Sequence, residues 1–308
     1  MSFAPSADYS AALVDGPWDH EFVSANGARF HVALAGAQDP SAPLVILLHD
    51  FGQCWWAWRH QIPALAEAGY RVAAMDLRGV AASDKPPAGY DTPTRTRDVA
   101  GVIRSLGFTR AAVVGHGTGG TVAWAMAALQ PAVTAGVAAF AAAHPARVHA
   151  PFATQYTRAA WKLVSLVQIP VLPERRLRNG SLLERLFALG GGKPLPSEAV
   201  DFYHTAMLIP FAAHTSAEAL RWTVRATTPR PDGMRYTAAV RREITQPTMQ
   251  VHGALDGILR RDRVDADGAA FSRDFRFEVF DDVGHYQPET APERTTDLLL
   301  DWLPHTRA

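Results

Sequence analysis

One short stretch in the middle of the sequence restricts the fold of the whole chain. Residues 115–120 read Gly-His-Gly-Thr-Gly-Gly, a density of glycine that regular elements rarely tolerate. The apolar residues 111–114 before it are short enough for a buried strand, and residues 121–130 after it predict a helix that ends at Pro131. A strand that enters a helix through a tight turn is the repeating unit of a parallel α/β sheet, so we expect that architecture.

Strand-like and helix-like segments alternate over the rest of the chain as this architecture requires. A hairpin comes first, with strands at 21–23 and 28–34 around an Asn26-Gly27 turn. Further strands are predicted at 44–49, 71–75, 135–140, 248–252 and 276–280, and helices at 58–68, 94–106 and 293–302. We therefore predict an α/β fold with a mainly parallel, doubly wound sheet of eight strands.

The alternation stops in the middle of the chain. Four segments there predict helices separated by proline and glycine, at 152–167, 174–189, 197–207 and 213–226. We interpret residues 144–236 as a helical cap inserted between two parts of one core, formed by residues 1–143 and 237–308.

Composition excludes several classes of partner. The chain has 30 basic and 30 acidic side chains among 308 residues, which gives no electrostatic reason to expect nucleic acid or an anionic membrane. The single cysteine excludes an internal disulfide framework and a multi-thiolate metal site. Neither a signal peptide nor a membrane-spanning apolar run is visible, so we expect a cytoplasmic protein that binds a small molecule, as a monomer or homodimer.

The central turn has the context of a nucleophile elbow, normally Gly-x-Ser-x-Gly, in which the middle residue attacks the substrate. Gly117 occupies that middle position, and glycine has no atom with which to form a covalent intermediate. Three explanations stay open: a naturally non-catalytic protein, an engineered knockout of a serine or aspartate, or a reaction without a nucleophile at this position. Thr118 and Cys54 are not expected to replace it, because Thr118 opens the helix and Cys54 is expected to be buried.

The same turn also fits a dinucleotide-binding fingerprint through Gly115, Gly117 and Gly120. That fingerprint needs an acidic residue about 20 residues later, and residues 133–143 contain neither Asp nor Glu. His116 and His252 lack the additional close ligands that a zinc site requires. We therefore predict neither a cofactor nor a metal.

The order of the segments, together with local motifs, resembles the α/β-hydrolase superfamily over roughly residues 20–305. Within it, the chain is most similar to the capped branch that holds epoxide hydrolases, haloalkane dehalogenases and related esterases. The motifs are His49-Asp50-Phe51-Gly52, residues 58–65, Asp76-Leu77-Arg78-Gly79 with residues 83–86, residues 115–120, residues 252–256, and Gly284-His285-Tyr286 with Pro292-Glu293. The resemblance implies an α/β-hydrolase fold with a helical cap and a pocket at the carboxyl ends of the strands.

The resemblance also implies roles for individual residues. His285 stands where the family has its general base, and Asp256 stands where the family has the carboxylate that orients it. The chain order of elbow, Asp256 and His285 is that of α/β-hydrolases. The backbone N–H groups of Phe51 and Thr118 occupy the positions of the oxyanion hole.

The sequence departs from the family pattern at further positions. Asp50 stands where the family usually has glycine, and its carboxylate could repel an oxyanion, act as a new acid or base, or point away from the site. Tyr156 and Tyr203 are candidates for the cap tyrosines that hold an epoxide oxygen, whereas Thr223 stands where the second tyrosine is expected. The remaining predicted substrate contacts are Trp55, with Trp56 beside it at the pocket rim, His116 and Trp222.

Two classes of function follow from these residues. In the first, which we prefer, the chain is a hydrolase for a small apolar ester or epoxide, with the Asp256–His285 pair intact and covalent attack lost or altered at Gly117. In a variant of this class, His285 would activate water directly or serve as the base of a cofactor-free lyase. In the second, the chain is a non-catalytic member of the fold that uses the pocket to bind a ligand.

Overall fold

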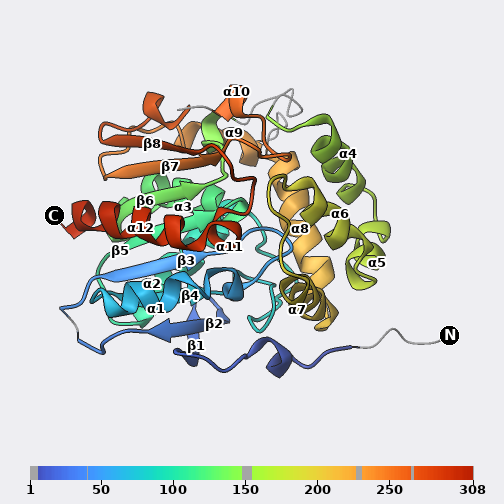
Figure 1. The fold of residues 1–308 in the computed structure, drawn as a ribbon, viewed down its shortest axis with the longest axis horizontal. Coiled ribbons are helices and arrows are strands. Elements are labelled where there is room, and N and C mark those ends of the chain that lie inside the picture. Colours follow the sequence, from blue (N-terminus) through green and yellow to red (C-terminus); the bar gives the residue numbers. More distant parts are fainter. Residues whose placement is uncertain (1–5, 40, 148–154, 227–230, 265–266, 308) are drawn as a thin grey trace.

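The computed structural model of the chain describes residues 6–39, 41–147, 155–226, 231–264 and 267–307 (Figure 1). Its centre is one eight-stranded sheet with the strand order β1-β2-β4-β3-β5-β6-β7-β8. The strands are β1 Asp19–Ala25, β2 Ala28–Ala35, β3 Leu44–Leu48, β4 Arg71–Met75, β5 Ala111–His116, β6 Thr134–Phe140, β7 Thr248–Gly253 and β8 Phe275–Phe280. The sheet is parallel from β4 to β8, and only β2 joins it antiparallel, with β1 as its hairpin partner. The predicted eight-stranded, mainly parallel sheet is therefore confirmed.

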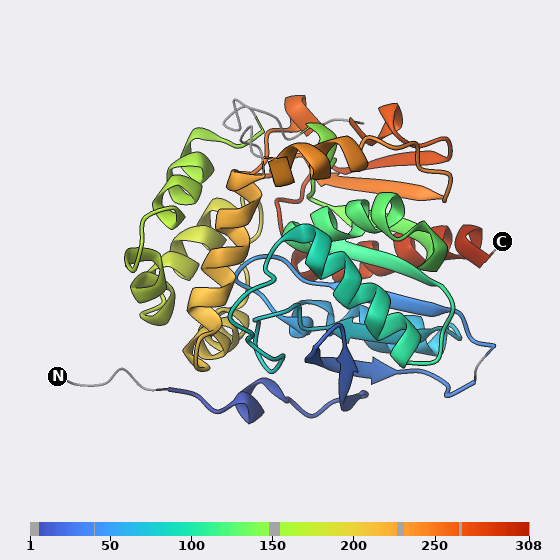
Figure 2. The ribbon, with the colours of Figure 1, turned by 180° about the vertical axis from the view of Figure 1, so that it is seen from behind.

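Burial explains the apolar sequences of the central strands. Every residue of β3, β4, β5 and β7 is buried, because helices cover both faces of the sheet. Helices α1 Gln61–Glu67 and α12 Pro292–Trp302 lie on one face (Figure 1), and α2 Thr92–Ser105 and α3 Thr118–Leu129 lie on the other (Figure 2).

Local chemistry sets the ends of these helices. The side chain of Asp91 accepts a hydrogen bond from the Thr94 N–H at 2.7 Å and so caps the first turn of α2. Helix α3 ends at Leu129, just before Pro131, as the sequence predicted. Two short helices, α10 Arg261–Val264 and α11 Gln287–Thr290, follow β7 and β8.

A layer of helices lies to one side of the sheet, opposite the C-terminus in Figures 1 and 2. Its members are α4 Arg158–Val167, α5 Leu172–Arg178, α6 Ser181–Leu189, α7 Ser197–Leu208 and α8 Ala212–Arg225, followed by α9 Pro231–Ala239. The single helix predicted over 174–189 is wrong: the chain breaks it at Gly180, whose φ of +80° is left-handed. The domain boundaries at 144 and 236 stay a prediction.

The helix predicted over 152–167 begins later than expected. Residues 152–154 lie outside the described residues, and Tyr156 is extended, with an isolated bridge to Leu259. Helix α4 starts only after Thr157, whose side chain caps it by accepting from the Ala160 N–H at 3.2 Å. None of the described helices is long and apolar enough to cross a membrane.

Candidate active site

The turn at residues 115–120 has the sharp strand-to-helix geometry of a nucleophile elbow. Gly117 links β5 directly to α3 and has φ +52° and ψ −114°, a conformation that L-residues adopt only under strain. Gly119 must also be glycine, since a Cβ there would lie 2.5 Å from the carbonyl oxygen of Leu48. Close approach to the neighbouring strand β3 therefore explains part of the glycine density of this turn.

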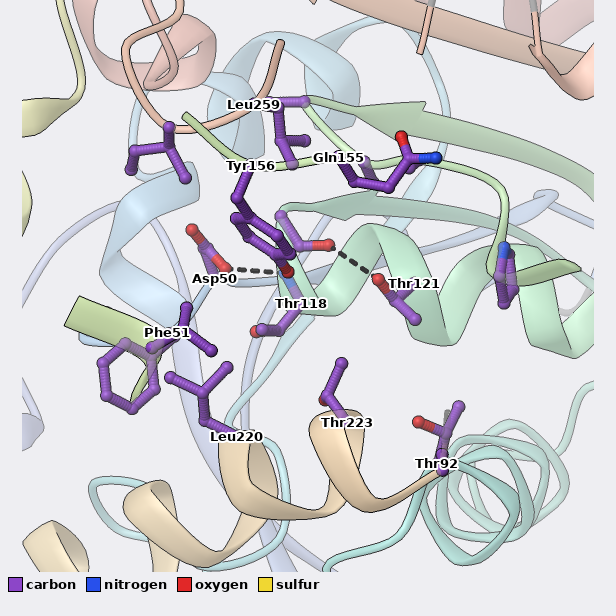
Figure 3. A pocket seen from close by; sticks show the side chains of 18 of the residues that line it. Asp50, Phe51, Thr92, Thr118, Thr121, Gln155, Tyr156, Leu220, Thr223 and Leu259 are labelled. Atoms are coloured by element: carbon purple, nitrogen blue, oxygen red, sulfur yellow. Dashed lines mark hydrogen bonds between the residues drawn. The ribbon is translucent and has the colours of Figure 1, made fainter. Parts of the chain in front are cut away.

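The carboxyl group of Asp50 lies where an elbow side chain would begin. A Cβ added to Gly117 would overlap the Cγ and both carboxylate oxygens of Asp50, far inside van der Waals contact. The Thr118 N–H donates to Asp50 Oδ1 at 2.6 Å, as drawn in Figure 3. Of the three alternatives that the sequence left open for Asp50, pointing away from the site is wrong, because the carboxylate points into the elbow.

The loop that carries Asp50 is fixed by His49. His49 Nδ1–H donates to the Asp50 carbonyl oxygen at 2.8 Å, and the Leu77 N–H donates to His49 Nε2 at 3.1 Å. This arrangement requires neutral imidazole, which agrees with a pKa of His49 that burial lowers. A neutral, doubly hydrogen-bonded histidine thus holds the backbone from which Asp50 reaches the elbow.

His285 lies between two carboxylates. Its Nδ1 is 2.8 Å from Asp256 Oδ2, and its Nε2 is 3.1 Å from Asp50 Oδ2. Asp256 is itself oriented by the N–H groups of Ile258 and Leu259, which donate to its Oδ1 at 2.8 and 2.9 Å. The structure thus brings Asp256 and His285 together as the chain order implied, and adds Asp50 on the opposite ring nitrogen.

The contacts of His285, Asp256 and Asp50 determine which of these side chains are charged. Burial by itself lowers the pKa of His285, but the charges and hydrogen bonds of Asp256 and Asp50 raise it to about 10. Burial would raise the pKa of Asp50, but His285, His116 and the Thr118 N–H hold it well below its usual range. At neutral pH the site therefore contains an imidazolium between two carboxylates.

A cavity of about 100 Å³ opens in front of these groups. Apolar side chains from α6 and α8 form much of the opposite wall, and Figure 3 shows Leu220 and Thr223 facing Asp50, Thr118 and Tyr156 across the pocket. Burial, followed by the charges of Asp50 and Asp256, raises the pKa of Tyr156, so its phenol keeps its proton. The predicted site residues that line the cavity are Asp50, Phe51, Gly117, Thr118, Tyr156, Trp222 and His285.

The remaining predicted substrate contacts lie elsewhere. Trp55 and Trp56 were expected at the pocket rim, but Trp55 is fully buried and its indole N–H donates to the Ala12 carbonyl oxygen at 2.8 Å. Trp56 packs against Phe202 in a tilted arrangement instead, with ring centroids 4.6 Å apart. Tyr203 is buried between Trp56 and Phe187 and is not among the residues that line the cavity. Aromatic packing against α7 accounts for the position of Trp56, and packing against Trp18, His20 and His31 accounts for that of Trp55.

His116 lies behind His285 and does not line the cavity. Its Nε2–H donates to the His285 carbonyl oxygen at 2.7 Å, and its Nδ1 is 3.1 Å from Gln53 Oε1. Gln53 in turn donates to Glu289, which also pairs with Arg59 at 2.8 Å. Gln53 and Glu289 were not predicted from the sequence, because no motif marks residues that lie behind a site and hold it in place.

Among the described residues, one trio has ligand atoms close enough to share a metal: Asp50, His116 and His285, within 4.8 Å of one another. Both ring nitrogens of His116 already face carbonyl oxygens, and both of His285 face carboxylates. A metal ion would have to displace the proton that the two carboxylates hold on His285. The expectation of no metal stays a prediction.

Comparison with known proteins agrees with this geometry. The family described as alpha/beta hydrolase fold matches residues 43–292. The AB hydrolase superfamily protein YfhM of Bacillus subtilis is 36% identical over 200 residues, which cover 62% of this chain and 68% of that protein. Epoxide hydrolase A of Mycobacterium tuberculosis is 29% identical, with 91% of this chain and 96% of that protein covered.

Solved structures show the same architecture. An epoxide hydrolase from an endophytic Streptomyces superposes with a TM-score of 0.78 at 26% identity, covering 95% of this chain and 97% of that one. These matches agree with the sheet, the elbow and the order of Asp256 and His285. The chain therefore belongs to the α/β-hydrolase family, in its epoxide hydrolase-like branch.

Proposed function

We propose that the protein is a hydrolase for small apolar epoxides or esters and that Asp256 and His285 act in its chemistry. The observation that supports this most directly is the position of His285. Its imidazole is oriented by Asp256 at 2.8 Å, and it reaches a carboxylate at the elbow beside the cavity. A histidine oriented in this way can move protons to and from a bound substrate.

The pocket favours an epoxide over an ester within this proposal. An epoxide needs an acid for its ring oxygen, and the protonated phenol of Tyr156 lines the cavity. Thr223, at the position where a second tyrosine was expected, also lines it and offers a smaller hydroxyl. We propose that the segment 144–236 acts as the cap, because α6 and α8 supply the wall of the pocket opposite the elbow.

The charge state of His285 argues against a lyase in which this residue is the resting base. A group whose pKa is about 10 carries its proton at neutral pH and cannot accept another. A non-catalytic binding role would need neither the Asp256 contact nor the second carboxylate at Asp50.

The test is a turnover assay with styrene oxide, small terminal epoxides and 4-nitrophenyl acetate. We expect diol from at least one epoxide, with a loss of about 10²–10⁴-fold in His285→Gln. Asp39→Asn, in an exposed loop, is the matched control and should keep full activity. If no substrate is turned over while styrene oxide still binds, the protein is a binding member of the family and the proposal is refuted.

A further inference from the structure

We propose that Asp50 is the covalent nucleophile of this protein. The attacking carboxylate then comes from the loop after β3, and glycine at position 117 leaves room for it. This inference rests on the proposed hydrolase function and narrows it, since it names the attacking atom and the class of substrate.

Asp50 and an elbow side chain would occupy the same space. The carboxyl group of Asp50 overlaps the position of a Cβ on Gly117, so one space serves either an elbow side chain or the Asp50 carboxylate, never both. The two departures from the family pattern, glycine at 117 and aspartate at 50, are therefore complementary. The position of the elbow side chain is filled by a carboxylate from the loop after the neighbouring strand β3.

Asp50 also has the partners that a nucleophilic carboxylate requires. Its Oδ1 accepts the Thr118 N–H at 2.6 Å, the donor that the family geometry assigns to the oxyanion. Its Oδ2 is 3.1 Å from His285 Nε2. The side chain is 8% exposed and lines the cavity, so it is desolvated yet accessible to a bound ligand.

The chemistry balances with water as the only co-reactant. A carboxylate oxygen of Asp50 attacks an epoxide carbon, the ring C–O bond breaks, and its electron pair passes to the ring oxygen. That oxygen takes a proton from the Tyr156 hydroxyl, and the imidazolium of His285 returns a proton to the phenolate. The products of this step are an ester of Asp50 with one free hydroxyl, and neutral His285.

The same step prepares the base for hydrolysis. Esterification removes the negative charge of Asp50, one of the two carboxylates that hold the proton on His285. Neutral His285 then takes a proton from water, the hydroxide attacks Cγ of Asp50, and the Thr118 N–H stabilises the oxyanion. The ester bond breaks, the leaving oxygen takes the proton from His285, and the new carboxylic acid of Asp50 gives its own proton to His285.

This assignment selects the substrate class. Attack of a carboxylate on an ester carbonyl would give an anhydride, which is less stable than the ester, whereas attack on an epoxide gives a stable alkyl ester. We therefore expect epoxides, and not esters, to be the substrates.

The experiment is a single turnover of styrene oxide in H₂¹⁸O with enzyme in excess. We expect one ¹⁸O atom in the carboxyl group of Asp50 and no ¹⁸O in the first diol formed, because the diol takes its second oxygen from Asp50. Trypsin releases residues 30–59 as one peptide, which also contains the exposed Asp39 as an internal control. Fragmentation of this peptide by mass spectrometry separates the two positions.

Two variants complete the test. His285→Gln should accumulate the ester, seen as the mass of styrene oxide added at Asp50, and Asp50→Asn should lose at least about 10³-fold of the turnover while circular dichroism stays native. If epoxide is hydrolysed with ¹⁸O only in the diol, and Asp50→Asn stays active, Asp50 is not the nucleophile although the hydrolase function stands. If there is neither turnover nor an adduct in any variant, both proposals fail.

Discussion

Because the Asp50 carboxyl group fills the space beside Gly117, substitutions at positions 50 and 117 should have strongly non-additive effects on the free energy of unfolding. In Gly117→Ala the new Cβ must displace the Asp50 carboxyl group from its bonds with Thr118 and His285. Alanine at φ +52° costs about 1–3 kcal/mol of strain, and forcing atoms into a packed site costs about 1–3 kcal/mol more. We expect a total loss of about 4 kcal/mol in the free energy of unfolding.

The same substitution should be milder once the carboxyl group is removed. In an Asp50→Gly background only the backbone strain remains, so Gly117→Ala should cost about 1–3 kcal/mol. The difference is the overpacking cost, a coupling of about 1–3 kcal/mol, which exceeds the ~0.5 kcal/mol scatter of independent sites. Urea unfolding of the wild type, both single variants and the double variant measures it, with a change in Tm of about 2 °C per kcal/mol as a second readout.

Additive effects would refute the steric argument. If Gly117→Ala destabilises both backgrounds equally, the Asp50 carboxyl group does not occupy the elbow in solution. The swap variant Asp50→Gly with Gly117→Asp adds a functional control, because it moves the carboxylate back to the elbow residue. We expect the swap to hydrolyse styrene oxide faster than Gly117→Asp alone, in which two carboxyl groups compete for one space.

Three further predictions concern His285 and its partners. The pKa of His285 is raised from 6.5 to about 10 in the folded protein, so the stabilisation that His285 provides is complete below pH 6.5 and is lost as the pH rises towards 10. The free energy of unfolding of the wild type should therefore fall over this range, and an equal fall in His285→Gln would contradict the role of His285. Asp256→Asn removes the carboxylate that raises the pKa of His285 more than Asp50 does, so this pKa, followed by NMR, should drop and the turnover should fall about 10²–10⁴-fold. An unchanged pKa would show that Asp256 does not hold the proton on His285. Tyr156→Phe should lower kcat for epoxides about 10²-fold with little change in KM, and a change confined to KM would mean that the phenol only binds substrate.

The sequence by itself determined the framework of this protein. Apolar runs separated by helical segments predicted the eight strands. The helical pattern placed both ends of α2 within two residues, and Pro131 placed the end of α3 within one residue. The order of Asp256 and His285 along the chain was enough to predict the pair, because each follows a strand that ends at the same edge of the sheet. These features depend only on local pattern and on the order of residues along the chain, and both can be read from a single sequence.

Only the tertiary structure shows where the Asp50 carboxylate points. Its side chain meets Thr118 across 68 residues of sequence and His285 across 235, so no local pattern reports which way it points. The burial of Trp55 and Tyr203 was hidden for the same reason, since it depends on neighbours brought together only by folding. The break at Gly180 differs, because Asn179-Gly180 is a local turn signal that the prediction of one long helix passed over. Along the chain, Gly117 and Asp50 look like two unrelated departures from the family pattern. In three dimensions the Asp50 carboxyl group occupies the space that a side chain at position 117 would need.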